Sequence, residues 1–204
     1  MDTTHVTSPP NHHAGQGGFS GLAGLLVAAS MAVGRGRDAA WAIDLARPAP
    51  GSTIVDIGCG PGQAVRIAAR RGWNAIGVDP SAQMLRVARW FDRSRRSTYL
   101  EGAAEAMPVG DAVAGACWSI ASVHHWTDVP AGLAEVHRIL APGTRFVAIE
   151  RSVAAGATGH ASHGWSDAQA EAFADMCRAA GFESVTIERS HTRRRQRVAV
   201  TSQV

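Results

Sequence analysis

The sequence predicts an α/β fold in which helices cover a doubly wound, largely parallel sheet. Short apolar runs alternate along the chain with segments of helical periodicity, and this alternation is typical of βαβ units. The last two apolar runs are separated by only about nine residues, too few for a helical crossover. We therefore expect the final two strands to be antiparallel.

Composition narrows the class of protein. The chain has 204 residues, of which 46% are hydrophobic and 18% charged, with a net charge of +3. These values fit one ordinary globular domain. All 20 basic residues are arginine, which excludes Schiff-base lysine chemistry and a P-loop lysine. The three cysteines have no metal-binding spacing, so we expect no metal site and a reducing, cytoplasmic location.

The N-terminal region differs from the rest of the chain. Residues 1–18 lack hydrophobic periodicity and are predicted to be a disordered tail, with residues 19–204 forming a single domain. Within that domain, residues 19–47 are expected to form a helical cap of two helices broken near residues 34–37. The apolar stretch 19–34 is too short and too rich in glycine and alanine to span a bilayer, so no membrane association is expected.

The remaining elements follow from periodicity and from start and stop signals. In the helix expected at residues 81–91, Met84, Ala88 and Phe91 share one stripe. Ser166 and Gln169 have capping-box spacing, which predicts the start of the last helix. Strands are expected at 52–57, 74–79, 98–101, 116–121, 144–150, 185–188 and 198–201, and the other helices at 63–71 and 130–140.

The most informative motif is Val-Asp-Ile-Gly-Cys-Gly-Pro-Gly at residues 55–62, between the first strand and a helix. Its glycines allow a tight turn and a close approach of a ligand to the backbone. A dinucleotide fingerprint requires a third glycine where Gln63 stands, and Pro61 removes one backbone donor. These departures argue against a dinucleotide-dependent oxidoreductase and favour a nucleoside-like ligand without phosphates.

Two aspartates strengthen this interpretation. Asp79 ends the second strand about twenty residues after the loop, where an acidic side chain can accept hydrogen bonds from ribose hydroxyls. Asp56, at the tip of the first strand, could bind a cationic group. Together they favour an adenosine that carries a charged amino-acid tail, although both aspartates could instead cap helices.

Five blocks of sequence, taken in order, identify a family. They cover residues 56–62, 77–84, 101–108, 122–126 and 133–143. With these blocks the chain resembles the class I S-adenosylmethionine-dependent methyltransferases, in their small-molecule branch that includes ubiquinone and menaquinone methyltransferases. The resemblance implies a Rossmann-like sheet in the order 3-2-1-4-5-7-6 with strand seven antiparallel. It also implies S-adenosyl-L-methionine as cofactor and S-adenosyl-L-homocysteine as product.

The resemblance further implies which residues bind the cofactor. Met84 would pack on the adenine, although a plain core methionine fits its periodicity equally well. The family usually has an aspartate where Ala103 stands, so only nearby backbone groups or Glu105 are left for the adenine amine. The full expected set is Asp56, Gly58, Cys59, Gly60, Gly62, Asp79, Pro80, Met84, Ala104, Glu105 and Ser119.

Candidate catalytic groups follow the fourth strand. His124 and His125 lie at the ligand edge of the predicted sheet, where a neutral imidazole could act as a general base. Alternatively, one histidine braces the loop and the other points to solvent. Trp126 could line an acceptor pocket or anchor the loop, and Glu150 ends the fifth strand at the same edge.

Missing motifs narrow the chemical class of the methyl acceptor. No Asn/Asp-Pro-Pro-aromatic motif follows the fourth strand, and no Pro-Cys nucleophile suits cytosine chemistry. We therefore expect a small organic acceptor and no nucleic-acid partner, with the oligomeric state left open. A protein that binds the cofactor without catalysis is the alternative.

Overall fold

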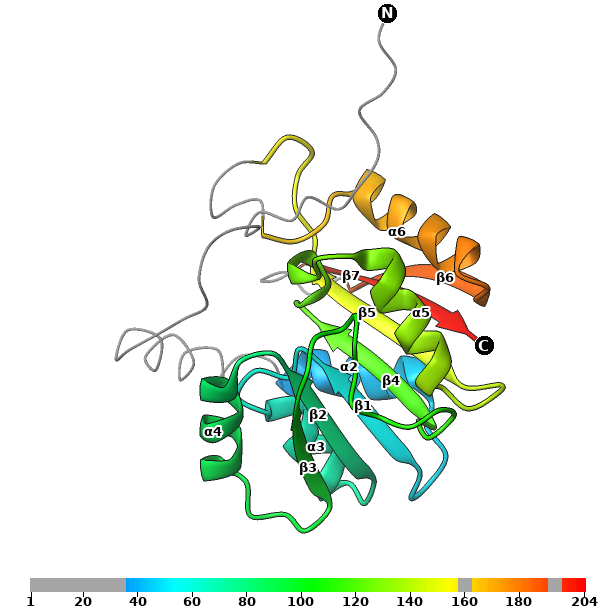
Figure 1. Cartoon of the computed structure of the whole chain (residues 1–204). Coiled ribbons are helices and arrows are strands. Elements are labelled where there is room, and N and C mark those ends of the chain that lie inside the picture. Colours follow the sequence, from blue (N-terminus) through cyan, green and yellow to red (C-terminus); the bar gives the residue numbers. More distant parts are fainter. Residues whose placement is uncertain (1–35, 158–162, 191–195) are drawn as a thin grey trace, which may run out of the picture.

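The computed structural model describes residues 36–157, 163–190 and 196–204. The predicted tail and the first helix of the predicted cap lie outside these residues. The elements, shown in Figure 1, are α2 (Gly36–Ala46), β1 (Thr53–Ile57), α3 (Gln63–Arg70), β2 (Asn74–Asp79), α4 (Ala82–Phe91), β3 (Ser97–Glu101), β4 (Ala116–Ile120), the 3-10 helix η1 (Val123–His125), α5 (Val129–Ile139), β5 (Arg145–Arg151), α6 (Asp167–Ala179), β6 (Glu183–Ser190) and β7 (Arg197–Gln203).

Seven strands of the described residues form one sheet in the order β3-β2-β1-β4-β5-β7-β6. Strands β1 to β5 pair in parallel, and β7 is antiparallel to both β5 and β6. The predicted order and the antiparallel final pair are therefore confirmed. Since parallel strands end at the same edge of a sheet, the loops after β1, β2, β4 and β5 come together.

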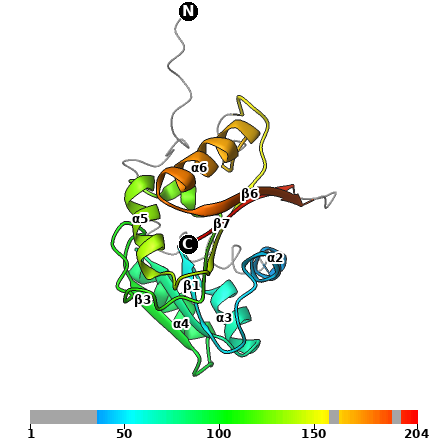
Figure 2. The same cartoon turned by 90° about the vertical axis from the view of Figure 1, so that its right-hand side faces the viewer.

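Helices cover both faces of the sheet. Helices α2 and α3 lie on one face, and α5 and α6 on the other, as Figure 2 shows. Helix α2 packs against α3, β4 and β5 through its small apolar stripe, which contains Ala39, Ala42 and Ile43. Leu85 and Ala88 of α4 join the same apolar cluster as α2 and α3. The central strands are buried on both sides, as their continuous apolar sequences require.

Local signals set several element boundaries. The predicted capping box is confirmed: the Ser166 N–H donates to Gln169 Oε1 at 2.9 Å, and the Gln169 N–H donates to Ser166 Oγ at 3.4 Å. Helix α6 then stops before Gly181, which has a φ of 90°. Asp128 caps α5 by accepting from the Ala131 N–H at 3.0 Å.

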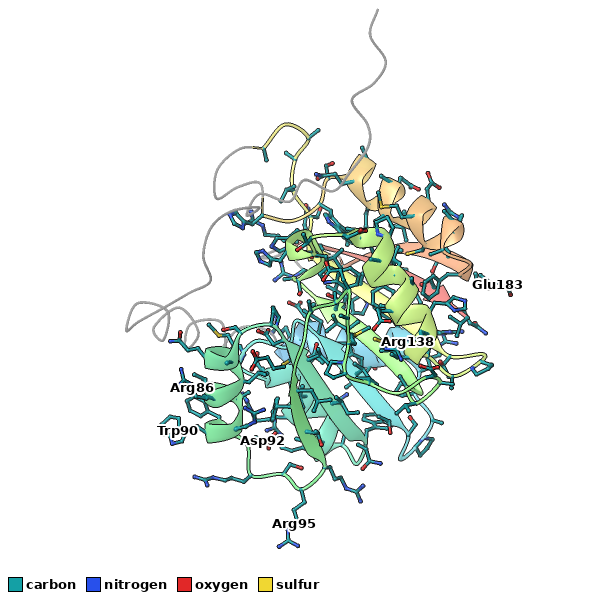
Figure 3. All side chains as sticks on the ribbon, viewed as in Figure 1. Arg86, Trp90, Asp92, Arg95, Arg138 and Glu183 are labelled. Atoms are coloured by element: carbon teal, nitrogen blue, oxygen red, sulfur yellow. The ribbon has the colours of Figure 1, made fainter. Side chains whose placement is uncertain are left out.

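Phe91 does not share the burial of Met84 and Ala88, with which it forms one stripe of α4. Its side chain is 49% exposed, and that of Trp90 next to it is 70% exposed. The buried surface of α4 consists of Met84, Leu85, Val87 and Ala88, so the last turn of the helix lies outside the apolar contact. The Arg66 guanidinium lies 5.9 Å from the centre of the Phe91 ring and partly covers it instead. Figure 3 shows Trp90 pointing away from the sheet.

Among the described residues, none of the helices has both the length and the apolar character needed to cross a bilayer. The single sheet supports the predicted organisation as one domain, which remains a prediction for residues 19–204.

Candidate functional site

The glycine loop turns directly from β1 into α3. Gly58, Gly60 and Gly62 have φ values of 69°, 52° and 74°, which favour glycine. At Gly62 an added Cβ would lie 2.6 Å from the Tyr99 hydroxyl, so this glycine is also required by packing. At Gly60 an added Cβ would meet nothing within 4 Å. The loop therefore presents bare backbone to open space at Gly60.

A surface hollow lies beside this loop. It is small and partly open to solvent. Its lining residues come from the end of β1, the loop, the start of α3 and the end of β4, and they are Asp56, Gly58, Cys59, Pro61, Gln63, Ala64 and Ile120. Three of the residues predicted to bind the cofactor therefore line one hollow.

Asp79 lies next to the exposed backbone of Gly60. Its side chain accepts hydrogen bonds from the Gly60 N–H at 2.8 Å and the Ser81 N–H at 2.9 Å. Burial raises the pKa of the Asp79 carboxyl, and these two backbone donors act in the opposite direction. A carboxylate has about four lone-pair directions, so further acceptor capacity remains for a ligand. Asp79 thus holds the loop and keeps further acceptor capacity.

Cys59 and Ser119 are buried beneath the same edge. Burial raises the pKa of the Cys59 thiol, and the carboxylates of Asp56 and Asp79 raise it further, so this thiol stays protonated. Ser119 is fully buried in β4, and its hydroxyl has no hydrogen-bond partner among the described residues.

The other residues predicted to bind the cofactor have distinct surroundings. Met84 is only 6% exposed, yet it belongs to neither of the two core clusters formed by the described residues. Pro80 is exposed and Ala104 is buried. Glu105 Oε1 accepts from the backbone N–H groups of Thr127 and Asp128, at 2.6 and 3.0 Å. Its observed contacts therefore position the start of α5, and a role toward adenine stays a prediction.

The structure pairs His124 with Glu150, which the sequence analysis did not. His124 Nδ1 lies 3.0 Å from both Glu150 Oε1 and Oε2, and the two residues are 7% and 1% exposed. The signal was an acidic residue at the end of an apolar strand, level with the histidines after the neighbouring strand. His125 is exposed, and its ring lies 4.0 Å from that of His124.

Trp126 anchors the loop that carries these histidines. Its ring is buried against the backbone of α5 at Gly132 and stacks on Phe146 at 6.3 Å. This packing supports a role for Trp126 as an anchor of the loop, and not as a wall of an acceptor pocket.

Three features of the site lie near the carboxyl ends of β1 and β2. Open space faces the Gly60 backbone, a buried carboxylate with spare acceptor capacity stands beside it, and Asp56 lines the hollow. The sheet that carries them has the strand order that the resemblance to the class I methyltransferases implied.

Comparison with known proteins leads to the same class. Residues 55–148 match a family described as a methyltransferase domain. This segment of the chain is therefore a methyltransferase domain, which confirms the resemblance to the S-adenosylmethionine-dependent enzymes.

Two curated relatives with assigned reactions match parts of the chain. A malonyl-[acyl-carrier protein] O-methyltransferase of Serratia marcescens is 34% identical over 122 residues, covering 60% of this chain and 46% of the relative. A ubiquinone/menaquinone biosynthesis C-methyltransferase, UbiE, of Rubrivivax gelatinosus is 31% identical over 116 residues, covering 55% and 45%. The chain thus matches about half the length of these relatives.

Solved structures agree on the fold. A SAM-dependent methyltransferase from Aquifex aeolicus has a TM-score of 0.74 at 13% identity, covering 88% of this chain and 97% of that one. Phosphoethanolamine N-methyltransferase 2 of Haemonchus contortus, solved with S-adenosylhomocysteine, has a TM-score of 0.68 at 16% identity, covering 82% and 52%.

Proposed function

We propose that this protein is an S-adenosyl-L-methionine-dependent methyltransferase that acts on a small organic molecule. The observation that carries the proposal is the bare backbone at Gly60, which faces open space beside the buried carboxylate of Asp79. The named relatives support it, since one is a malonyl-[acyl-carrier protein] O-methyltransferase and the other a C-methyltransferase of ubiquinone/menaquinone biosynthesis.

Each part of the site has a role in this proposal. Gly58, Gly60 and Gly62 contact the methionine part of the cofactor, and Asp56 binds its ammonium group directly or through water. Asp79 accepts from the ribose hydroxyls, and Met84 and Pro80 lie beside the adenine. Cys59, Ala104, Glu105 and Ser119 complete the set of proposed cofactor-binding residues.

Catalysis then depends mainly on alignment. When bound, the cofactor supplies an activated methyl group: the acceptor's electron pair forms the new bond to the methyl carbon, and the pair of the broken S–C bond stays on sulfur. The protein holds the acceptor in line with that bond and limits access of water. His124 takes a proton from the acceptor where one must be lost, and His125 lies at the rim.

The state of the cysteine thiols supports a proposal for the cellular location of the reaction. All three cysteines, Cys59, Cys117 and Cys177, are free and buried. This supports a reducing, cytoplasmic location. We propose that the methyl acceptor is not a nucleic acid and that the protein does not bind a membrane.

Calorimetry with S-adenosyl-L-homocysteine tests cofactor binding. Gly60→Ala should retain the fold and weaken binding by at least about tenfold, because the new methyl group enters the ligand space. Gly51→Ala is the matched control, since Gly51 also has a positive φ, of 73°, with nothing within 4 Å of an added Cβ. Equal binding by both variants, or no binding by the unaltered protein at millimolar ligand, would contradict the proposal.

A cofactor-binding protein without catalysis is the second candidate. Ala103 at the usual aspartate position favours it, because this change removes an acceptor for the adenine amine. Turnover of labelled S-adenosyl-L-methionine with a metabolite mixture separates the two candidates.

A further inference from the structure

We propose that Glu150 is a positioning residue that holds His124 with its proton on Nδ1, so that Nε2 is the base. The acceptor of this enzyme is then a weakly acidic O–H or C–H group, such as a phenol, an enol or an activated methylene, and not a carboxylate. This inference rests on the proposed function and names its class of substrate.

The geometry of the pair determines the tautomer. His124 Nδ1 lies 3.0 Å from both oxygens of Glu150, and the Glu150 side chain is 1% exposed. An ionised carboxylate can only accept hydrogen bonds, so the shared proton belongs to Nδ1. Burying a carboxylate without a partner is costly, which favours keeping this N–H in place. In the neutral ring, Nε2 then carries the free lone pair.

The backbone brings the two residues together from neighbouring strands. Ile120 of β4 is in register with Ile149 of β5, so the residues that follow each strand lie side by side. The Ala121 N–H donates to Ile149 O at 2.7 Å, and Ala121 has a φ of 51°. This turn directs the chain into η1 and places His124 over the end of β5.

Two further histidine rings lie near His124. The His125 ring lies 4.0 Å away, and the His163 ring lies 6.0 Å away in an edge-on arrangement. His163 comes from the segment that follows β5, near Trp165. Histidine rings therefore lie beside the pair at the carboxyl ends of β4 and β5, the sheet edge from which the glycine loop also leaves.

This arrangement suits acceptors that must lose a proton. The O–H or C–H proton passes to His124 Nε2, and the electron pair left on the acceptor forms the bond to the donated methyl carbon. The carboxylate of Glu150 stabilises the imidazolium until its proton returns to solvent. A carboxylate acceptor is already ionised at neutral pH. Methylation of a carboxylate to an ester requires no proton removal, so the His124–Glu150 pair would have no role in it.

The tautomer can be measured without an acceptor. Long-range ¹⁵N–¹H correlation on the full chain labelled in histidine, with S-adenosyl-L-homocysteine present and His124 assigned through His124→Gln, should show the proton on Nδ1. Glu150→Met should move it to Nε2, the form that free imidazole side chains prefer, while the exposed control Glu183→Met should not. A proton on Nε2 in the unaltered protein, or no change in Glu150→Met, would overturn the assignment.

The acceptor class is tested with defined probes. We would supply acetoacetyl-N-acetylcysteamine, 4-hydroxybenzaldehyde and malonyl-N-acetylcysteamine, and follow transfer of a labelled methyl group. The first two should be methylated, with kcat falling by about 10²-fold in His124→Gln and about tenfold in Glu150→Gln at little change in KM. Glu150→Asp should recover part of the loss. Methylation of the malonyl carboxylate at a rate unaffected by His124→Gln would overturn the inference.

Failure of this inference is distinguishable from failure of the proposed function. Calorimetric binding of S-adenosyl-L-homocysteine reports on the proposed function alone, and the His124 tautomer reports on the pair alone.

Discussion

Asp79 combines two demands on one carboxylate. It accepts from the N–H groups of Gly60 and Ser81, and in the proposed function it also accepts from ribose. Because burial raises the pKa of this carboxyl, it becomes protonated at a higher pH than an ordinary aspartate.

Binding of S-adenosyl-L-homocysteine should therefore weaken as the pH falls through this raised pKa. Protonation replaces an acceptor with a donor and removes the charge that strengthens the bonds to ribose. Calorimetry at a series of pH values checks this, with Asp79→Asn expected to bind weakly and without that pH dependence. The free energy of unfolding depends on pH in the opposite direction. The raised pKa means that the folded state binds the Asp79 proton more tightly than the unfolded state does, so the contribution of Asp79 to stability is lost as the pH rises through that pKa.

Gly132 has no room for a larger side chain, because a neighbouring ring occupies the space beside it. An added Cβ would lie 2.5 Å from Cε3 of the buried Trp126 ring. Gly132→Ala should lower the free energy of unfolding by about 1–3 kcal/mol, because a well-packed ring must move. Denaturant unfolding measures this, and Ala134→Ser at an exposed position of the same helix should change stability by less than about 0.5 kcal/mol. An equal effect of the two substitutions would argue against the packing explanation.

At the scale of elements, end signals matter as much as apolar stripes. Helix α6 begins with a reciprocal capping box, in which Ser166 and Gln169 each satisfy a backbone donor of the other. Ser166→Ala should destabilise the protein by about 1 kcal/mol in thermal or denaturant unfolding. Asp175→Ala on the same helix removes only an exposed pair with Arg178 and should have a smaller effect. If both variants lose the same free energy of unfolding, the capping box stabilises the protein no more than an exposed ion pair does.

Helix α4 shows where a periodic pattern is insufficient. Met84, Ala88 and Phe91 recur at helical spacing, and two of the three are buried. Periodicity identifies a face of the helix but not how far the sheet extends beneath it. The exposed Phe91 and Trp90 lie past the end of that contact.

Over the whole molecule, one ion pair joins parts of the chain that are 159 positions apart. Arg197 Nε of β7 lies 3.2 Å from Asp38 Oδ2 of α2, and both side chains are 12% exposed. Because the pair is largely shielded from water, removing one partner leaves the other poorly solvated.

A double-mutant cycle with Asp38→Asn and Arg197→Gln should give a coupling free energy of about 0.5–3 kcal/mol in unfolding experiments. The exposed pair of Arg189 and Asp167, which joins the consecutive elements β6 and α6, is the comparison and should show coupling below about 1 kcal/mol. Additive effects at Asp38 and Arg197 would mean that α2 is held by its apolar stripe alone.

The sequence by itself determined the sheet, its antiparallel final strands and the glycine loop, because these depend on local periodicity, short connections and backbone freedom. It also indicated Asp79 and His124, since strand ends in a parallel sheet meet at one edge. Only the tertiary structure decided the partners of these groups. His124 with Glu150, Glu105 with the start of α5 and Gly62 with Tyr99 each join segments far apart in the chain, and such contacts follow from strand register and side-chain packing that no local pattern encodes.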